Sequence, residues 1–111
     1  MVSKISKACD ISPKVRKEVY DRDGCCIVCG TTRNLQVAHF IGRGRLGLGI
    51  PQNLGMMCIE CHRRYDNGDA HKTIEIIFEN HLKNHYKNWS KDKLVYHKHQ
   101  IAPQDIFNEK E

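Results

Sequence analysis

The chain has 111 residues, a formal net charge of +5 and a pI near 8.9. This length excludes two independent hydrophobic cores, and it makes a bound metal a useful source of stability. No segment has the length and apolarity of a transmembrane helix, and the polar start MVSKISKACD lacks the apolar region of a secretory signal. We therefore expect an intracellular, cytoplasmic protein that contacts no membrane.

The first expected element is a helix over residues 13–22, preceded by an N-terminal arm over residues 1–12. Ser12 is a favourable N-cap, and Pro13 suits the first helical position because its fixed φ is already helical. Gly24 then provides a common C-terminal stop.

A strand is expected next, over residues 35–41, because apolar and β-branched residues dominate that segment. It carries His39. Residues 42–52 contain four glycines and a proline, which favours a mobile loop, and this loop bears Arg43 and Arg45. Loops of this composition often carry functional residues.

The second half of the chain is expected to be mainly helical. A strand over residues 53–57 leads to a short helix over residues 59–66, which Asn67-Gly68 should end. An apolar stripe then predicts a helix over residues 72–88 that packs on the preceding module. The sequence thus divides into a module over residues 13–70, a C-terminal helix and arm over residues 71–100, and a loose tail over residues 101–111.

Two Cys-x2-Cys motifs flank the expected strand pair. Two thiolates separated by two residues can bind one tetrahedral metal ion from a tight turn, so two such motifs supply the four ligands of a structural zinc. Disulfides are the alternative, but the absence of a signal peptide favours reduced, metal-bound thiolates. The predicted zinc ligands are Cys26, Cys29, Cys58 and Cys61. The remaining cysteines, Cys9 and Cys25, are expected to be free thiols.

Acidic residues are absent from Gly24 to Ile59, whereas arginines are concentrated in and beside this segment. A planar guanidinium group binds phosphate through two hydrogen bonds, so this distribution favours contact with a DNA backbone. A solvated basic face without a ligand is the alternative. The predicted phosphate contacts are Arg43, Arg45, Arg63 and Arg64.

The order of these motifs resembles the HNH endonuclease family, in particular its small phage-type members. The matching residues are Cys26-x2-Cys29, Ala38-His39-Phe40-Ile41 followed by Arg43, Asn53-Leu54 and Cys58-x2-Cys61-His62. The resemblance covers residues 13–68. It implies an α+β fold in which a zinc-stapled ββα-metal module carries an N-terminal helix and a packed C-terminal helix.

The resemblance also implies roles for three residues. His39 is the general base, which suits an imidazole because it titrates near neutral pH. His62 binds a catalytic divalent ion, Mg²⁺ or Mn²⁺, and Asn53 orients the base by holding the loop. Simpler interpretations stay open: His39 as a packed strand residue, His62 as a solvent-facing or zinc-binding residue, and Asn53 as a turn residue.

One position departs from the family pattern. Many members have an Asp, Glu or His immediately before the general base as a second metal ligand, and here that residue is Ala38. The nearest carboxylate that could replace it is Asp66, one helical turn after His62, and His71 lies just beyond. Alternatively, His39 itself binds the ion.

These features predict a metal-dependent DNA endonuclease that hydrolyses phosphodiesters with a His general base and one divalent ion. At the family level, we expect a role in phage DNA processing or packaging in the bacterial host cytoplasm, with phage packaging proteins as partners. A non-catalytic zinc-knuckle nucleic-acid-binding protein is the alternative, because it would use the same cysteines and arginines. A thiol-disulfide oxidoreductase is a third interpretation, which the lack of a thioredoxin-like βαβ pattern disfavours.

Overall fold

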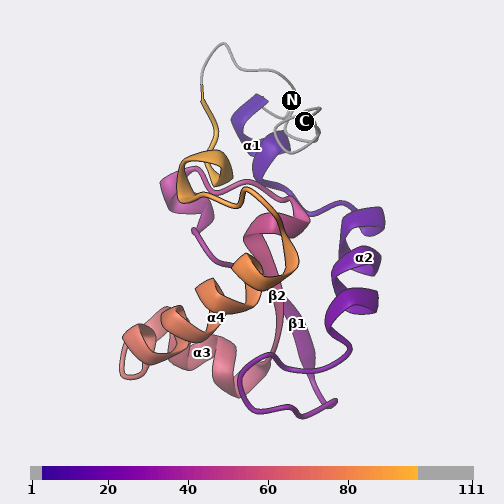
Figure 1. The fold of residues 1–111 in the computed structure, drawn as a ribbon, viewed down its shortest axis with the longest axis vertical. Coiled ribbons are helices and arrows are strands. Elements are labelled where there is room, and N and C mark those ends of the chain that lie inside the picture. The colour runs from indigo at the N-terminus through magenta and orange to yellow at the C-terminus, as the bar shows by residue number, and fades with distance from the viewer. Residues whose placement is uncertain (1–3, 98–111) are drawn as a thin grey trace.

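The centre of the fold is a two-stranded antiparallel sheet of β1 (Leu35–His39) and β2 (Leu54–Cys58) (Figure 1). The α-helices are α1 (Lys4–Cys9), α2 (Pro13–Asp23), α3 (Ile59–Asn67) and α4 (His71–His85). Short 3-10 turns connect them: η1 (Arg43–Arg45), η2 (Pro51–Asn53) and η3 (Lys91–Leu94). This computed structural model describes residues 4–97, so the expected loose tail over residues 101–111 lies outside the described residues. The fold is α+β, as predicted.

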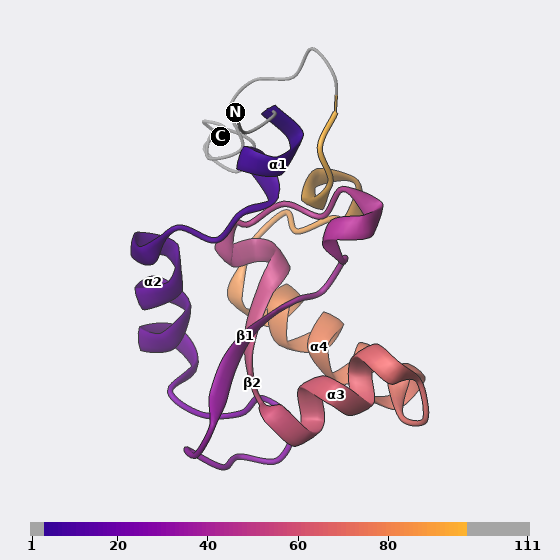
Figure 2. The same cartoon turned by 180° about the vertical axis from the view of Figure 1, so that it is seen from behind.

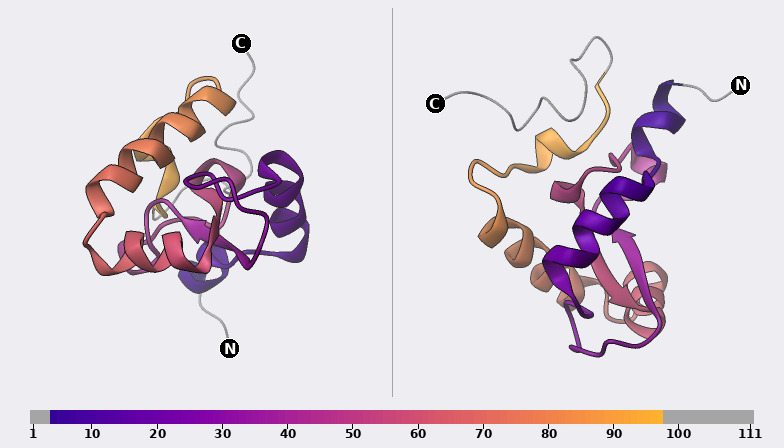
Figure 3. Two further views of the ribbon diagram at one scale, coloured as in Figure 1. Left: turned by 90° about the horizontal axis from the view of Figure 1, so that it is seen from below. Right: turned by 90° about the vertical axis from the view of Figure 1, so that its right-hand side faces the viewer.

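The two faces of the sheet pack against different helices, with α2 on one side and α3 and α4 on the other (Figures 1 and 3). Val37 and Met56 pack with Val19 of α2, whereas Ala38 and Met57 join the larger apolar cluster of α3 and α4. Successive residues of a strand point to opposite faces. Both faces of this small sheet are therefore buried.

The local helix signals read from the sequence are present in the structure. Ser12 Oγ accepts a hydrogen bond from the Val15 N–H (3.1 Å), and Gly24 ends α2 in the left-handed conformation with a φ of 68°. The helices expected over residues 13–22 and 59–66 are confirmed as α2 and α3. The helix expected over residues 72–88 is shorter and ends at His85. None of the helices within residues 4–97 has the length and apolar character that a membrane crossing requires.

Residues 42–52, expected to form a mobile loop, are instead packed between two other segments. On one side, the Leu48 N–H donates to the Leu94 carbonyl (2.7 Å) in the arm that follows α4. On the other side, the Gly49 N–H donates to the Ala8 carbonyl (3.0 Å) in α1, a helix that the sequence did not predict. The views in Figures 1 and 2 show α1, this loop and the arm gathered at one end of the molecule.

A buried ion pair joins α2 to β2 and α4. The Asp23 carboxylate accepts hydrogen bonds from Arg22 (2.6 and 2.8 Å), His81 (2.8 Å) and the Met56 N–H (2.9 Å). Arg22 also donates to the Tyr86 hydroxyl (2.9 Å) and to two backbone carbonyls. Burial alone would raise the pKa of Asp23, but these hydrogen bonds hold it well below its usual range. The ionised carboxylate thus fixes the relative positions of three elements.

Candidate functional site

Four cysteines come together at one end of the sheet: Cys26, Cys29, Cys58 and Cys61. Their Sγ atoms all lie within 4.8 Å of one another, and those of Cys29 and Cys58 are 3.7 Å apart. A tetrahedral zinc ion with Zn–S bonds of about 2.3 Å places its sulfurs about 3.8 Å apart. The cluster therefore fits a structural metal ion such as the predicted zinc.

Backbone amides favour the thiolate form of Cys26 in this cluster. The N–H groups of Val28 and Cys29 point at Cys26 Sγ (3.4 and 3.5 Å), and the Cys61 N–H points at Cys58 Sγ (3.4 Å). Burial would raise the pKa of Cys26, but amide donors, that of Cys29 foremost, lower it to about 7. Burial and the neighbouring sulfurs raise the pKa of Cys61. A bound cation would relieve this crowding of negative charge.

The cysteine cluster and His39 lie at opposite ends of the sheet. Cys58 pairs with Leu35 where β1 begins, and Leu54 pairs with His39 where β1 ends. With a rise of roughly 3.3 Å per residue, these pairs are about 13 Å apart along the strands. The cysteines thus form a scaffold at a distance from His39.

His39 is partly buried at the end of β1, and one of its ring nitrogens is occupied. Nε2 lies 3.0 Å from the carbonyl oxygen of Cys9. Because a carbonyl can only accept, Nε2 carries the proton in the neutral ring, and Nδ1 keeps its lone pair. Burial lowers the pKa of His39, and the charges of Arg43 and His62 add to this effect, while the Cys9 carbonyl opposes it. The neutral imidazole is therefore favoured.

Asn53 is fully buried, and its side chain holds the loop that follows β1. Oδ1 accepts from the Ile41 N–H (2.8 Å), and Nδ2 donates to the carbonyls of Ile41 (3.0 Å) and Leu48 (2.8 Å). The Asn53 carbonyl also accepts from the Phe40 N–H (2.7 Å), next to His39. The loop-holding contacts expected of Asn53 are thus present, in η2 rather than in the predicted strand over residues 53–57.

His62 and Asp66 lie one turn apart on α3, and their side chains meet. His62 Nε2 is 3.2 Å from Asp66 Oδ2, and His62 Nδ1 bonds to the side-chain oxygen of Gln36 in β1 (2.7 Å). Within residues 4–97, the four cysteines are the one group of three or more residues whose ligand atoms lie close enough together to bind one metal ion. His39 therefore does not join His62 and Asp66 as a third ligand.

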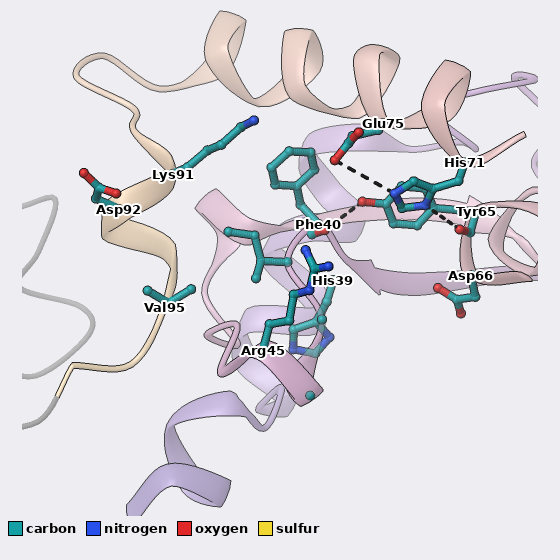
Figure 4. A pocket seen from close by; sticks show the side chains of 13 residues that line it. His39, Phe40, Arg45, Tyr65, Asp66, His71, Glu75, Lys91, Asp92 and Val95 are labelled. Carbon is teal, nitrogen blue, oxygen red and sulfur yellow. Dashed lines mark hydrogen bonds and ion pairs between the residues drawn. The ribbon is translucent and has the colours of Figure 1, made fainter. Parts of the chain in front are cut away.

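An open cleft of about 660 Å³ lies between the end of β1, α3, α4 and η3 (Figure 4). His39, Arg45 and Asp66 line it, together with Glu75 and Lys91. The predicted site residues outside this lining are Asn53, His62, Arg43, Arg63 and Arg64. The cleft thus unites the expected base with the expected carboxylate ligand and one expected arginine.

Tyr65 and His71 form a wall of the cleft. The Tyr65 hydroxyl donates to the Phe40 carbonyl (2.7 Å), and His71 Nδ1 donates to the Tyr65 carbonyl (2.8 Å) while the two rings stack 4.7 Å apart. Sequence reasoning missed Tyr65, although its position four residues after Cys61 marks the buried face of a helix. Glu75 also lines the cleft, but it belongs to no motif by which the sequence could have identified it as a site residue.

Acidic side chains lie beside the predicted phosphate-binding arginines, although the segment from Gly24 to Ile59 contains none. Three of the four arginines have acidic partners from outside the acid-free segment: Arg43 with Asp10 (2.7 Å), Arg63 with Glu60 (3.0 Å) and Arg64 with Asp69 (3.8 Å). Arg45 has no acidic partner in the part of the chain that the structure describes. Folding thus brings Asp10 to Arg43 from far away in the sequence, whereas Glu60 and Asp69 are close to their arginine partners along the chain.

Comparison of the chain with protein-family models, with curated proteins and with solved structures finds no match. The resemblance to HNH endonucleases therefore depends on the residues that carry it. Of these, the four cysteines converge at one end of the sheet, and His39 and Asn53 lie at the other end.

Proposed function

We propose that this protein is a metal-dependent DNA endonuclease of the HNH type, with β1, β2 and α3 as its ββα-metal module. The observation that carries the proposal is the state of His39, whose Nε2 is bonded to the Cys9 carbonyl (3.0 Å) and which lines the same cleft as Asp66. Nδ1 is then the lone-pair nitrogen that a general base needs. Burial, by lowering the pKa of His39, keeps this base neutral near pH 7.

In the proposed reaction, Nδ1 of His39 removes a proton from a water molecule as the water oxygen bonds to the scissile phosphorus. The bond from phosphorus to the 3′ oxygen breaks in line, and the leaving oxygen takes a proton from solvent. The products are 5′-phosphate and 3′-hydroxyl ends. Asn53 acts by holding the loop beside the base, as its hydrogen bonds to Ile41 and Leu48 indicate.

His62 and Asp66 are the proposed ligands of the divalent ion. An imidazole nitrogen and a carboxylate oxygen 3.2 Å apart could share a divalent transition-metal ion such as Mn²⁺, with Mg²⁺ bound mainly through the carboxylate, and Gln36 holds the other ring nitrogen of His62 so that Nε2 faces Asp66. When bound, the ion supplies positive charge to a phosphate oxygen and to the leaving 3′ oxygen. Asp66 would in this way replace the ligand that is missing at Ala38.

The proposed substrate is DNA, bound through its phosphates. Arg45 lines the cleft without an acidic partner in the described chain, so it is the first candidate for a phosphate contact. Exposed ion pairs such as Arg43 with Asp10 are worth only about 0–1 kcal/mol, so phosphates can replace these carboxylates. A role in phage DNA processing or packaging, with phage packaging proteins as partners, is proposed from the resemblance alone.

A plasmid-nicking assay tests this function. Wild-type protein should convert supercoiled DNA to the nicked or linear form only with added Mg²⁺ or Mn²⁺. His39→Ala should lower the rate about 10²- to 10⁴-fold, because the general base is lost. His85→Ala, an exposed histidine on α4, is the matched control and should retain the wild-type rate.

Two results would contradict the proposal, and each of them rejects a different part of it. Equal nicking by His39→Ala would reject the role of His39. Wild-type protein that binds DNA tightly but does not cut it with either ion would favour the non-catalytic zinc-knuckle alternative.

A further inference from the structure

The backbone of residues 8–10 contacts both the proposed base and the loop beside it. The Cys9 carbonyl accepts from His39 Nε2 (3.0 Å), and the Ala8 carbonyl accepts from the Gly49 N–H (3.0 Å). On the outside, the Asp10 carboxylate pairs with Arg43 (2.7 Å). Three consecutive residues from the N-terminal segment therefore hold the site, although they lie about 30 residues before His39.

Gly49 lets residues 8–10 lie against the loop over residues 42–52, because glycine has no Cβ atom. A Cβ atom at Gly49 would overlap the carbonyl group of Asp10 and would lie 3.0 Å from the Cys9 oxygen, which is the acceptor for His39. Gly44, in the same loop, differs in this respect, because a Cβ atom there would meet nothing within 4 Å. Gly47 is also closely packed, but against Ile41 and Gly42, so the contact with Cys9 and Asp10 is made at Gly49.

We propose that Gly49 and the backbone of Cys9 and Asp10 form a positioning device that fixes His39 as the tautomer protonated on Nε2. This inference rests on the proposed function, since it concerns the orientation of the base. A neutral imidazole has two tautomers, and only the one with an unprotonated Nδ1 presents a lone pair on the side away from Cys9. The Cys9 carbonyl selects that tautomer, and Gly49 keeps the carbonyl in place.

The tautomer of His39 in the wild-type protein is the first test. Long-range ¹H–¹⁵N NMR spectra of the full-length, ¹⁵N-labelled protein distinguish the two ring nitrogens, and His39→Gln identifies the signals of this residue. We expect Nε2 to carry the proton at a pH where the ring is neutral. A ring protonated on Nδ1 would overturn the proposal. This measurement involves no DNA, and the variant His39→Gln is needed only for the assignment of the signals.

The matched pair Gly49→Ala and Gly44→Ala is the second test. Gly49→Ala should displace the Cys9 carbonyl, mix the two tautomers of His39 and lower the cleavage rate at saturating DNA about 10²-fold, with DNA affinity unchanged. Gly44→Ala, which meets no other atom, should leave the tautomer of His39 unchanged. A Gly49→Ala protein that keeps both the wild-type tautomer and the wild-type rate would contradict the positioning role. If Gly49→Ala fails to fold, the tautomer of His39 measured in the wild-type protein alone tests the positioning proposal.

The endonuclease proposal and the proposal on the positioning of His39 can be refuted independently. A wild-type protein that has the expected tautomer but does not cleave DNA would refute the endonuclease and leave the positioning of His39 intact. A protein that cleaves DNA while His39 is protonated on Nδ1 would refute the positioning of His39 and the assignment of Nδ1 as the base, but would leave the endonuclease activity intact.

Discussion

At the residue scale, the burial of His39 sets the pH range in which the proposed base can act. Its pKa lies below the ordinary 6.5, so the neutral, proton-accepting form persists as the pH falls through 6.5 and is lost only as the pH falls through the lowered pKa. We predict that the acidic limb of a profile of kcat/KM against pH has its midpoint below pH 6.5. A midpoint above 6.5 would show that the ring is solvated or paired with an anion in solution.

The buried side chain of Asn53 makes three hydrogen bonds to the loop that follows β1. Asn53→Ala should lower the free energy of unfolding by about 2–4 kcal/mol, because it leaves the Ile41 N–H and the carbonyls of Ile41 and Leu48 without their partner. Urea unfolding measures this loss. Asn80→Ala, at an exposed position of α4, is the control and should change stability by less than about 0.5 kcal/mol.

Cysteine spacing predicted the four-cysteine cluster, which the structure brings together. The roles of His39 and His62 were implied by the family resemblance, and Asp66 was proposed as the nearest carboxylate; these roles stay predictions. A backbone atom could not be identified from residue types. The carbonyl that holds His39 belongs to Cys9, and every residue has a carbonyl. Which one meets His39 depends on tertiary packing, so the sequence contains no local signal for it.

At the element scale, the ion pair at the end of α2 links elements that have no covalent connection nearby. Asp23→Ala should cost about 3–5 kcal/mol of stability, because it leaves Arg22 charged and partly buried without its carboxylate. Asp21→Ala is the matched control, since its carboxylate is 59% exposed in an ion pair with Lys17 and should cost under about 1 kcal/mol. Equal losses in chemical denaturation would contradict a structural role for the buried pair.

The same carboxylate predicts how stability depends on pH. In the unfolded chain Asp23 takes up a proton near its ordinary pKa of 3.8, whereas in the fold its pKa is lower. The unfolded state therefore binds more protons between these values, and the stability from Asp23 is lost as the pH falls below 3.8. Unfolding free energies measured from pH 6 down to pH 3 should fall less steeply for Asp23→Asn than for the wild type.

Elements with strong local signals were predicted well, and elements held by distant contacts were not. Ser12 and Gly24 mark both ends of α2, and both residues act there as caps. By contrast, α1 has only six residues, which are too few for an apolar periodicity to identify a helix. The loop over residues 42–52 has the composition of a mobile segment, but its order comes from partners such as Ala8 and Leu94, which are far away in the sequence.

At the scale of the whole molecule, the metal cluster should decide whether the chain folds. Structural zinc sites bind with about 10–16 kcal/mol, which matches or exceeds the 5–15 kcal/mol or so of a typical small fold. Metal analysis should find one zinc per chain, and Cys58→Ser should abolish both zinc and the folded circular dichroism spectrum. Cys25→Ser, next to the cluster but outside it, should retain both. A folded wild-type protein without metal would refute this dependence.

The contacts of the loop over residues 42–52 also affect the order in which parts of the protein fold during synthesis. A growing chain emerges from its N-terminus, so both cysteine motifs exist once residue 61 has been synthesised, long before Leu94 and Tyr96 can pair with the loop. An unfinished chain could thus bind a metal ion while the loop still lacks its hydrogen-bond partners Leu94 and Tyr96. The loop beside the proposed cutting site would reach its final structure only after residue 96 has been synthesised, later than the cysteine cluster.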